Sequence, residues 1–304
     1  MSHAHFRSLG LRLAILAGLA AFAAPALAQQ PPQNLTVHQL KSNVYWAEGA
    51  GGNSGIIIGN NGVVIVDAKV SADGGKMLLA EVAKLTNKPV THAILTHSDG
   101  DHINGLAAFP SGVKVIAHEG NKMEQEAAAK AGGRGAPPPQ AMPTIVVTKN
   151  SETMTLDGVK FELHHWAPAH TSGDLIVYLP AEGIVFTGDI VATQREDPII
   201  HTEKHGSSEG WITTMQGIDN LKADTFVPGH GDVQTRAQIE ARLKRVSDKR
   251  AQIAAMIKQG KSLDEIKAAV GDTPPAPAAG GGRGRGGPQF ASLSDVVYGE
   301  LKGK

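Results

Sequence analysis

The sequence of 304 residues has no cysteine, few aromatic residues and no excess charge of either sign. Without cysteine the fold can contain no disulfide, so packing of the core, alone or with bound metal, must stabilise it. Any metal must then be held by nitrogen and oxygen ligands. Lysine and arginine number 29, as do aspartate and glutamate. This balance lacks the concentrated positive field that nucleic-acid binding requires, so we expect no nucleic-acid partner.

Long apolar runs are also missing, apart from one near the N-terminus. Arg7 and Arg12 precede or flank the apolar stretch 13–24, and residues 26–28 (Ala-Leu-Ala) match the small-x-small pattern of a cleavage site. The run is short for a membrane span. We predict a signal peptide at residues 1–28, a periplasmic or secreted protein, and no stable membrane insertion after cleavage. An uncleaved anchor is the alternative.

The remaining chain alternates strand-like and helical patterns, which is typical of an α/β layered core. Strand patterns occupy 35–48, 54–58, 62–68, 91–96, 114–117, 144–147, 160–164, 175–179 and 184–187. Helical spacing occupies 74–85, a turn at 105–109, 211–221 and 293–301. Two further helices are predicted to begin at the capping-box pairs Thr235 with Gln238 and Ser262 with Glu265.

Three irregular segments interrupt these patterns. Residues 127–143 start Ala-rich and helical and then become rich in Gly and Pro, which indicates an active-site lid or a disordered insertion. Residues 193–210 form a polar loop, and both segments are candidates for substrate selection. Residues 273–288 are a low-complexity tract of Pro, Gly, Ala and Arg. We therefore predict that residues 272–304 are a flexible tail with a short terminal helix.

The strongest local signal for chemistry follows the strand at 91–96. It reads Thr96-His97-Ser98-Asp99-Gly100-Asp101-His102, with four potential metal ligands within six residues. A strand end followed by a tight loop directs alternate side chains to one place, and Gly100 allows the sharp turn. A polar surface loop is the alternative interpretation.

Three other segments repeat this arrangement of a ligand-type residue in a turn or at a strand end. His170 lies in a turn between strands, Asp189 ends the apolar run Phe186-Thr187-Gly188, and His230 lies between Gly229 and Gly231. Each could occupy an ordinary turn, but four such positions in one chain favour a shared metal site.

The order of these motifs resembles that of the metallo-β-lactamase superfamily: a His-x-His-x-Asp-His loop, a later His, a strand-end Asp or Cys, and a final Gly-His. The resemblance spans residues 43–231. It implies a four-layer αβ/βα sandwich, here at residues 29–271, with metals at one edge between two sheets. Asp67, at the end of the early hairpin, matches a residue that supports the metal loop in this family.

The resemblance also implies a ligand set and a mechanism. His97, Asp99 and His170 would hold a first metal ion, Asp101, His102 and His230 a second, and Asp189 would bridge them. A hydroxide between two divalent ions would then attack the substrate, with Asp101 orienting it. The metals are expected to be zinc.

The sequence departs from the family pattern at Asp99, where the second His of the motif is expected. An anionic oxygen replaces a neutral imidazole, which makes bound water less acidic and suits iron or manganese better than a His-rich site does. The flavodiiron branch of the superfamily has a Glu at this place, although its usual flavodoxin domain is missing here.

Other polar residues have a simpler interpretation. His92 and His118 are predicted to be structural. For His201, His205 and Ser207, in the polar loop, we favour a surface position over contact with substrate.

The sequence thus predicts a metal-dependent hydrolase that acts on an ester, lactone, thioester or amide of a small molecule, with weak β-lactam hydrolysis at most. The alternatives are a di-iron protein that handles electrons or oxygen, and a binding protein that keeps metal for structure. Neither the individual substrate nor the oligomeric state has a signature in the sequence.

Overall fold

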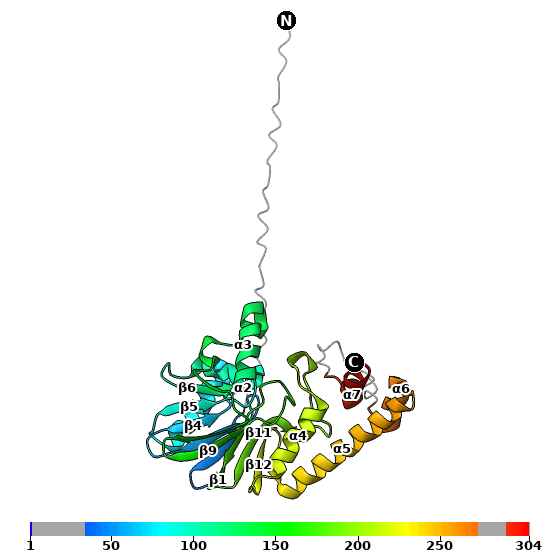
Figure 1. Cartoon of the computed structure of the whole chain (residues 1–304). Helices are drawn as coiled ribbons and strands as arrows, with labels where there is room; N and C mark the ends of the chain where they lie inside the picture. The colour runs from blue at the N-terminus through cyan, green and yellow to red at the C-terminus, as the bar shows by residue number, and fades with distance from the viewer. Residues whose placement is uncertain (2–33, 273–289, 304) are drawn as a thin grey trace. The chain divides into compact units, whose positions relative to one another are not determined.

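The computed structural model describes Met1, residues 34–272 and residues 290–303. All of the predicted signal peptide beyond Met1, and the low-complexity tract at 273–288, lie outside the described residues. The described residues form a pair of sheets with helices on both outer sides (Figure 1).

The first sheet has seven strands in chain order, antiparallel from β1 to β4 and parallel from β4 to β7. The strands are β1 (Thr36–Lys41), β2 (Val44–Glu48), β3 (Ser54–Ile58), β4 (Val63–Val66), β5 (Val90–Ile94), β6 (Lys114–His118) and β7 (Ile145–Val147).

The second sheet has six strands in the order β13-β12-β11-β10-β9-β8, of which only β11 and β12 run parallel. The strands are β8 (Ser151–Leu156), β9 (Val159–His164), β10 (Ile176–Leu179), β11 (Ile184–Ala192), β12 (Thr225–His230) and β13 (Gln234–Thr235).

Helices α4 and α5 lie beside β11 and β12 and pack on the second sheet (Figure 1), while α1 packs on the outer face of the first sheet. The α-helices are α1 (Ala72–Leu85), α2 (Gly100–Ile103), α3 (Glu119–Ala131), α4 (Ser208–Asp219), α5 (Arg236–Lys258), α6 (Leu263–Val270) and α7 (Leu293–Lys302). The 3-10 turns are η1 (Asn104–Ala108), η2 (Gly133–Gly135), η3 (Pro139–Ala141) and η4 (Thr202–Lys204).

Three hydrophobic clusters separate four layers, and the alternation of side chains along central strands builds them. In β4, Val64 and Val66 enter the cluster between the two sheets, while Val63 and Ile65 face the cluster under α1. Each such fully buried side chain contributes about 1.5–3 kcal/mol of hydrophobic free energy. The predicted four-layer αβ/βα architecture is therefore confirmed.

Several predicted boundaries were wrong. The alternation over 35–48 is two antiparallel strands, β1 and β2, because the turn between them, Ser42-Asn43, contains no glycine or proline to mark it. Strands β8 and β13 were not predicted, since β8 is mostly polar and β13 has two residues. The Ala-rich helix begins at Glu119, well before residue 127, with His118 as its N-cap.

The C-terminal helices pack on the second sheet. Both predicted capping boxes are present, at Thr235 for α5 and at Ser262 for α6. The predicted terminal helix is also present as α7, and its Leu293 and Val297 are buried in the cluster shared with α4 and α5. The domain boundary at residue 271 stays a prediction. Within residues 290–303, α7 packs into the same hydrophobic cluster as α4 and α5.

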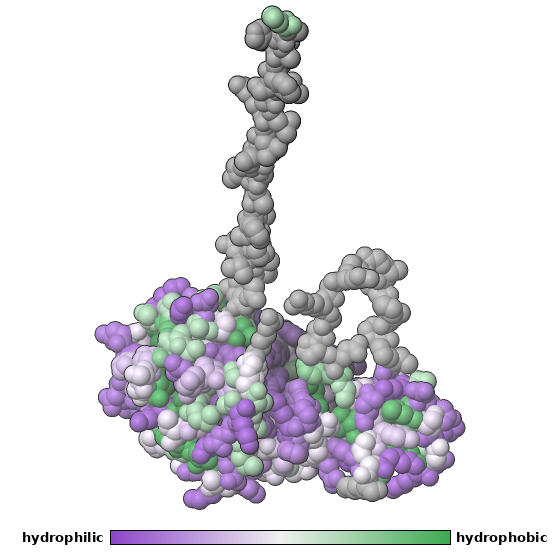
Figure 2. All heavy atoms as spheres, turned by 90° about the horizontal axis from the view of Figure 1, so that it is seen from above, coloured by the Kyte–Doolittle hydropathy of each residue, from purple (hydrophilic) through white to green (hydrophobic). Residues whose placement is uncertain are grey.

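Hydrophilic residues cover much of the face shown in Figure 2, with apolar ones interspersed. Among the described residues beyond Met1, only Met123 and Leu301 are large apolar side chains that are exposed. No helix of the described ranges combines the length and the apolar character that crossing a membrane requires.

Candidate metal centre

The loop after β5 is held by the residue that follows the neighbouring strand β4. These strands are parallel, so their C-terminal ends meet at one edge of the sheet. There Asp67, at a positive φ of 58°, accepts hydrogen bonds from the backbone N and the Oγ of Thr96 at 2.8 and 2.7 Å. The sequence prediction that Asp67 supports the metal loop agrees with this geometry.

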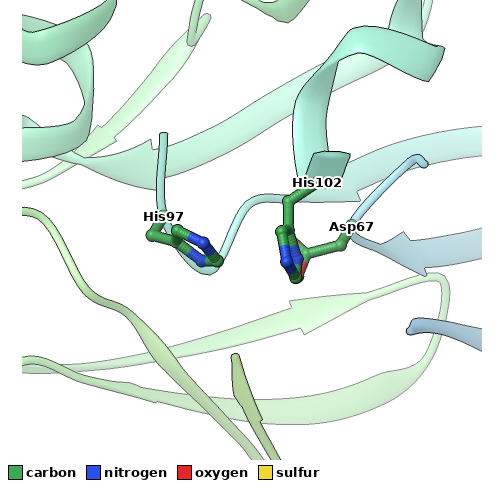
Figure 3. A group of neighbouring side chains, drawn as sticks. All are labelled: Asp67, His97 and His102. Atoms are coloured by element: carbon green, nitrogen blue, oxygen red, sulfur yellow. The ribbon is translucent and has the colours of Figure 1, made fainter. Parts of the chain in front are cut away.

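Asp67 orients His102 directly and His97 through Thr96; Figure 3 shows Asp67 against His102, with His97 nearby. His102 donates from Nδ1 to Asp67 at 2.8 Å, and both side chains are buried. The single hydroxyl proton of Thr96 goes to Asp67, so the hydroxyl accepts from Nδ1 of His97, 2.9 Å away. With each Nδ1 engaged, both rings keep Nε2 as the free ligand atom.

The loop that carries His170 connects β9 and β10. Nδ1 of His170 donates to the carbonyl of Ile199 at 2.8 Å, which again leaves Nε2 for the centre. Asp174 closes the loop by accepting from the backbone N and Oγ of Thr171. Burial raises the pKa of Asp174 to about 6.

The last two predicted ligands lie on neighbouring parallel strands. Asp189 lies within β11, beyond the predicted strand end at Thr187, and His230 ends β12. A side chain on Gly229 would place its Cβ 1.9 Å from Oδ1 of Asp189, so glycine makes room for the carboxylate. The amide of Asn53 ties the same turn to the first sheet by donating to Pro228 O at 2.9 Å.

Six of the seven predicted site residues come together in two groups. His97, Asp99 and His170 form one group, and Asp101, His102 and His230 form the other. In each group the possible ligand atoms all lie within 4.8 Å of one another.

Asp189 lies between the two groups. Its Oδ1 is 3.3 Å from Nε2 of His102, and its Oδ2 is 3.6 Å from Nε2 of His230 and 4.0 Å from that of His170.

Two buried atoms at the centre have no hydrogen-bond partner among the described residues: Nε2 of His97 and Oδ1 of Asp189. An unsatisfied buried polar atom costs about 1–3 kcal/mol, so such a pair requires a partner. A ring nitrogen and a carboxylate oxygen are both metal ligands. The residues present therefore fit a pair of divalent ions.

The carboxylates of the centre and His97 take the forms that bind metal, whereas His102 and His170 hold protons that a metal ion would displace. Burial opposes protonation of both rings, but Asp189 raises the pKa of His102 and Asp99 raises that of His170 to about 9.

Burial, with the charge of His102, lowers the pKa of His97 well below its usual value, which keeps this ring neutral. Burial works against ionisation of Asp101, but the hydrogen bond with His230 lowers its pKa to about 2. Burial likewise opposes ionisation of Asp189, yet the charge of His102 holds its pKa far below the usual range. The carboxylates are therefore ionised at neutral pH.

The structure adds two residues that sequence reasoning had placed elsewhere or passed over. His201 was expected at the surface, but its side chain is 15% exposed and its Nε2 is 3.2 Å from Oδ2 of Asp99. Lys204 donates to Oδ1 of Asp99 and was not singled out at all. Neither residue lies in a motif; the 3-10 turn η4 and the backbone hydrogen bond from His201 to His170 bring them to the centre.

The histidines predicted to be structural lie away from the centre. Nδ1 of His118 accepts from the backbone N of Gly120, and its ring stacks on His165 with centroids 3.8 Å apart. His92 lies beside Asp157 at 3.4 Å. His205 is exposed and ends η4, and Ser207 is the N-cap of α4.

A cavity of about 330 Å³ opens onto the centre. Its floor includes Asp99, Asp101, His170, Asp189, His201 and His230, and its walls are Ala192, Gln194, Arg195, Ile199 and Phe290. The loop 193–210 therefore contributes to this cavity, whereas Gly135 and Pro137 of the 127–143 segment line an adjoining one. The Arg195 guanidinium lies 5.2 Å from the centroid of the Phe290 ring.

Comparison with known proteins agrees with this geometry. A family model described as the metallo-beta-lactamase superfamily matches residues 47–230, from β2 to His230. The linear primary-alkylsulfatase of Pseudomonas sp. (strain ATCC 19151) is 25% identical over 251 residues, which cover 67% of this chain and 47% of that protein. The beta subunit of the 2,4-dinitroanisole O-demethylase of Nocardioides sp. (strain JS1661) is 27% identical over 223 residues, 72% of this chain and 66% of that one. The chain thus spans about half to two thirds of the length of these two relatives.

Shorter relatives are covered more fully. A type 2 metallo-beta-lactamase of Bacteroides fragilis is 27% identical over 210 residues, 66% of this chain and 80% of that protein. Among solved structures, a stereoselective inverting sec-alkylsulfatase from Pseudomonas sp. has a TM-score of 0.65 at 16% identity, over 87% of this chain and 50% of that one. A metallo-beta-lactamase from Pontibacter korlensis has a TM-score of 0.59 at 21% identity, over 70% and 99%. These structural likenesses concern the fold.

Proposed function

Because the chain belongs to the metallo-beta-lactamase superfamily, we propose that it is a metal-dependent hydrolase that cleaves an ester, lactone, thioester or amide. The observation that carries this proposal is the pair of three-residue ligand groups with Asp189 between them. Unpartnered ligand atoms on His97 and Asp189 supply the physical reason for bound ions.

We assign the ligands by these groups. His97, Asp99 and His170 would hold a first ion, Asp101, His102 and His230 would hold a second, and Asp189 would be shared between them. Four imidazoles suit zinc, and the carboxylate of Asp99 also admits iron or manganese. The relatives with metallo-beta-lactamase in their names support divalent metal, and zinc is our first choice.

Held there, two divalent ions would supply an acidified water and a Lewis acid for the substrate carbonyl. Asp101 would orient that water by accepting a hydrogen bond from it. Its side chain is 35% exposed and lines the cavity, and its lowered pKa keeps the carboxylate ionised as an acceptor. Asp189, at 7% exposed, lies between the two groups and would hold the two halves together.

The walls of the cavity select the substrate. Ala192, Ile199 and Phe290 are apolar, while Arg195 offers a positive charge at the same cavity. We therefore propose a small substrate with an apolar group beside an anionic one. β-Lactams carry a carboxylate and belong in the test set, with weak turnover expected because Asp99 and Asp189 differ from a dedicated β-lactamase.

The protein is proposed to act in the periplasm or outside the cell after removal of residues 1–28, on the basis of its N-terminal sequence. The mass of the mature chain, isolated from a cell fraction, tests this directly. A mass that includes residues 1–28 would contradict it.

The test of the hydrolase proposal is hydrolysis by purified protein before and after removal of metal. A panel should include p-nitrophenyl esters, a lactone, a thioester, an amide and a β-lactam, with an alkyl sulfate and a nitroaryl ether suggested by the relatives. We expect at least one substrate whose hydrolysis stops with a chelator and returns with added zinc. Hydrolysis that persists in verified metal-free protein would contradict the proposal.

A di-iron protein that transfers electrons or handles oxygen is the second candidate, and Asp99 is the observation that favours it. It predicts bound iron and a visible spectrum that changes with a reductant. A colourless protein loaded with zinc would exclude it.

A further inference from the structure

Asp99 occupies the position where the metal motif departs from its family, and its two oxygens have different surroundings. Its Oδ2 faces three imidazole nitrogens: Nε2 of His97 at 3.8 Å, of His170 at 3.3 Å and of His201 at 3.2 Å. Its Oδ1 instead accepts from the ammonium group of Lys204. One oxygen therefore faces the centre and the other faces away.

We propose that His201 is a further ligand of the first metal ion, and that it supplies the imidazole that Asp99 displaces from the motif. This inference rests on the proposed two-metal centre. The first ion would then have His97, Asp99, His170 and His201, with Asp189 shared between the ions.

The orientation of the ring is the first argument. Nδ1 of His201 donates to Oε1 of Glu203 at 2.5 Å, which turns Nε2 toward Asp99. His97, His102 and His170 follow the same rule, since each has Nδ1 bound to an oxygen and Nε2 toward the centre. Such an outer partner fixes the ring and strengthens its basicity, as it does for metal-bound histidines generally.

The backbone around His201 is the second argument. Its N donates to the carbonyl of His170 at 2.8 Å, and Ser207 N donates to the carbonyl of Ala169 at 3.0 Å. A Cβ on Gly206 would lie 2.4 Å from the carbonyl oxygen of His170, so the two loops approach closely. The loop of His201 is therefore attached to the loop of an assigned ligand, and the ring is placed before any ion binds.

Burial supports the same conclusion. The His201 side chain is 15% exposed and lines the floor of the cavity. Its ring makes edge contacts with His170, with centroids 4.8 Å apart, and with Phe290, with centroids 5.6 Å apart. These contacts hold the ring beside an assigned ligand.

Lys204 completes the arrangement. It donates to Oδ1 of Asp99 and, at 3.0 Å, to Oγ of Ser98, which donates in turn to Glu124 at 2.5 Å. This chain occupies Oδ1 and leaves Oδ2 to a metal ion. The ammonium charge also offsets the negative charge that Asp99 adds relative to a histidine.

The experiment compares His201→Asn with His205→Asn in the full mature chain loaded with Co²⁺. His205 is an exposed histidine in the same loop, and asparagine tolerates its φ of 60°. Proton spectra of the Co²⁺ protein report the N–H of each bound imidazole as a strongly shifted signal, and competition with a chelator reports affinity. We expect His201→Asn to lose one shifted signal and to bind one of two ions at least about tenfold more weakly, while His205→Asn matches the wild type.

The outcomes separate this inference from the proposed function. If the wild type binds two Co²⁺ and His201→Asn keeps every shifted signal and the affinity, His201 only hydrogen-bonds to Asp99 and the inference is wrong. A wild type that binds no Co²⁺ contradicts the proposed function itself.

A second variant guards against poor folding of His201→Asn. Glu203 has a side chain that is 67% exposed, so Glu203→Ala leaves the fold intact and frees Nδ1 of His201. We expect one shifted N–H signal to move or to exchange faster with water, and the other signals to stay. A spectrum identical to that of the wild type would overturn the inference.

Discussion

The two halves of the candidate metal centre are built in different ways. In the half with Asp101, His102 and His230, the donors come from strand ends and from one short helix, and buried Asp67 stands behind His102. In the half with Asp99, the donors also depend on the irregular segment 199–204, which supports His170 and brings His201 and Lys204 into place.

The difference shows where a metal site tolerates change. A ligand side chain whose position depends on regular strands can move little, because the hydrogen bond between Asp67 and Thr96 fixes the loop to the edge of the sheet. A ligand residue beside an irregular loop can be replaced by another residue type when the loop supplies a compensating side chain. The replacement of an imidazole by Asp99 is accompanied by one cation, Lys204, and one further imidazole, His201.

The largest effect is expected from a substitution that weakens metal binding in both halves at once. Asp189→Asn keeps the shape of the bridging side chain and removes its charge. We expect metal content to fall and hydrolysis to drop by about a thousandfold, at the upper end for loss of a preorganised charged group. Elemental analysis and kcat/KM measure this, with Asp264→Asn on the exposed face of α6 as control. Unchanged metal content in Asp189→Asn would show that this residue does not bridge.

The next effect sharpens the comparison by weakening the support of one half. Asp67→Asn removes the charge that orients His102 and leaves a side chain of equal size. Loss of such an outer partner typically costs about 10–100-fold in metal affinity. We expect the ion held by Asp101, His102 and His230 to be lost first in a chelator titration. If the affinity for both ions fell equally, the hydrogen bonds that join Asp67 to His97 through Thr96 would support metal binding as strongly as the direct bond from His102 to Asp67.

A smaller effect tests the wall of the cavity beside the first half. Arg195 is exposed, and its guanidinium lies over Phe290. Arg195→Ala is expected to raise KM for an anionic ester about tenfold, or ~1.4 kcal/mol of binding, without changing KM for the matching neutral ester. Equal changes of KM for both esters would show that Arg195 does not recognise the charge of the substrate.

A last effect concerns the stability of the fold around the second half and leaves the chemistry of the centre unchanged. Lys69 is fully buried and donates to the carbonyls of Ala47 and Gly52, and burial lowers its pKa from 10.5 to about 7. Between these values the unfolded chain holds a proton that the folded chain has released, so Lys69 makes stability rise as pH rises. Below pH 7 both states are protonated and its burial cost is complete.

Urea unfolding at pH 7 and pH 9 measures this contribution. The free energy of unfolding of the wild type, relative to that of Lys69→Met, should increase as pH increases. A difference between the two proteins that is independent of pH would mean that Lys69 keeps its proton when buried.

The sequence predicted those elements in which local pattern and tertiary structure agree. The strands before Asp67 and His97 are short buried runs, and the ligand clusters follow them directly, so layers and candidate ligands could be inferred. The turn at Ser42-Asn43 and the polar strand β8 lack such signals.

Long-range contacts explain the remaining differences. His201 reaches the centre through backbone hydrogen bonds to the His170 loop, and Phe290 through the packing of α7 on α5. Neither contact leaves a periodic or spaced motif in the sequence. The predicted surface position of His201 was therefore wrong for a physical reason.

The most direct test of the central claim is the number of metal ions per chain. Elemental mass spectrometry of the mature protein, purified from the cell without added metal, measures it. We predict two divalent ions per chain, zinc first, held by the two groups around Asp189. A folded protein that binds no metal, before or after incubation with zinc, iron or manganese, would contradict this claim.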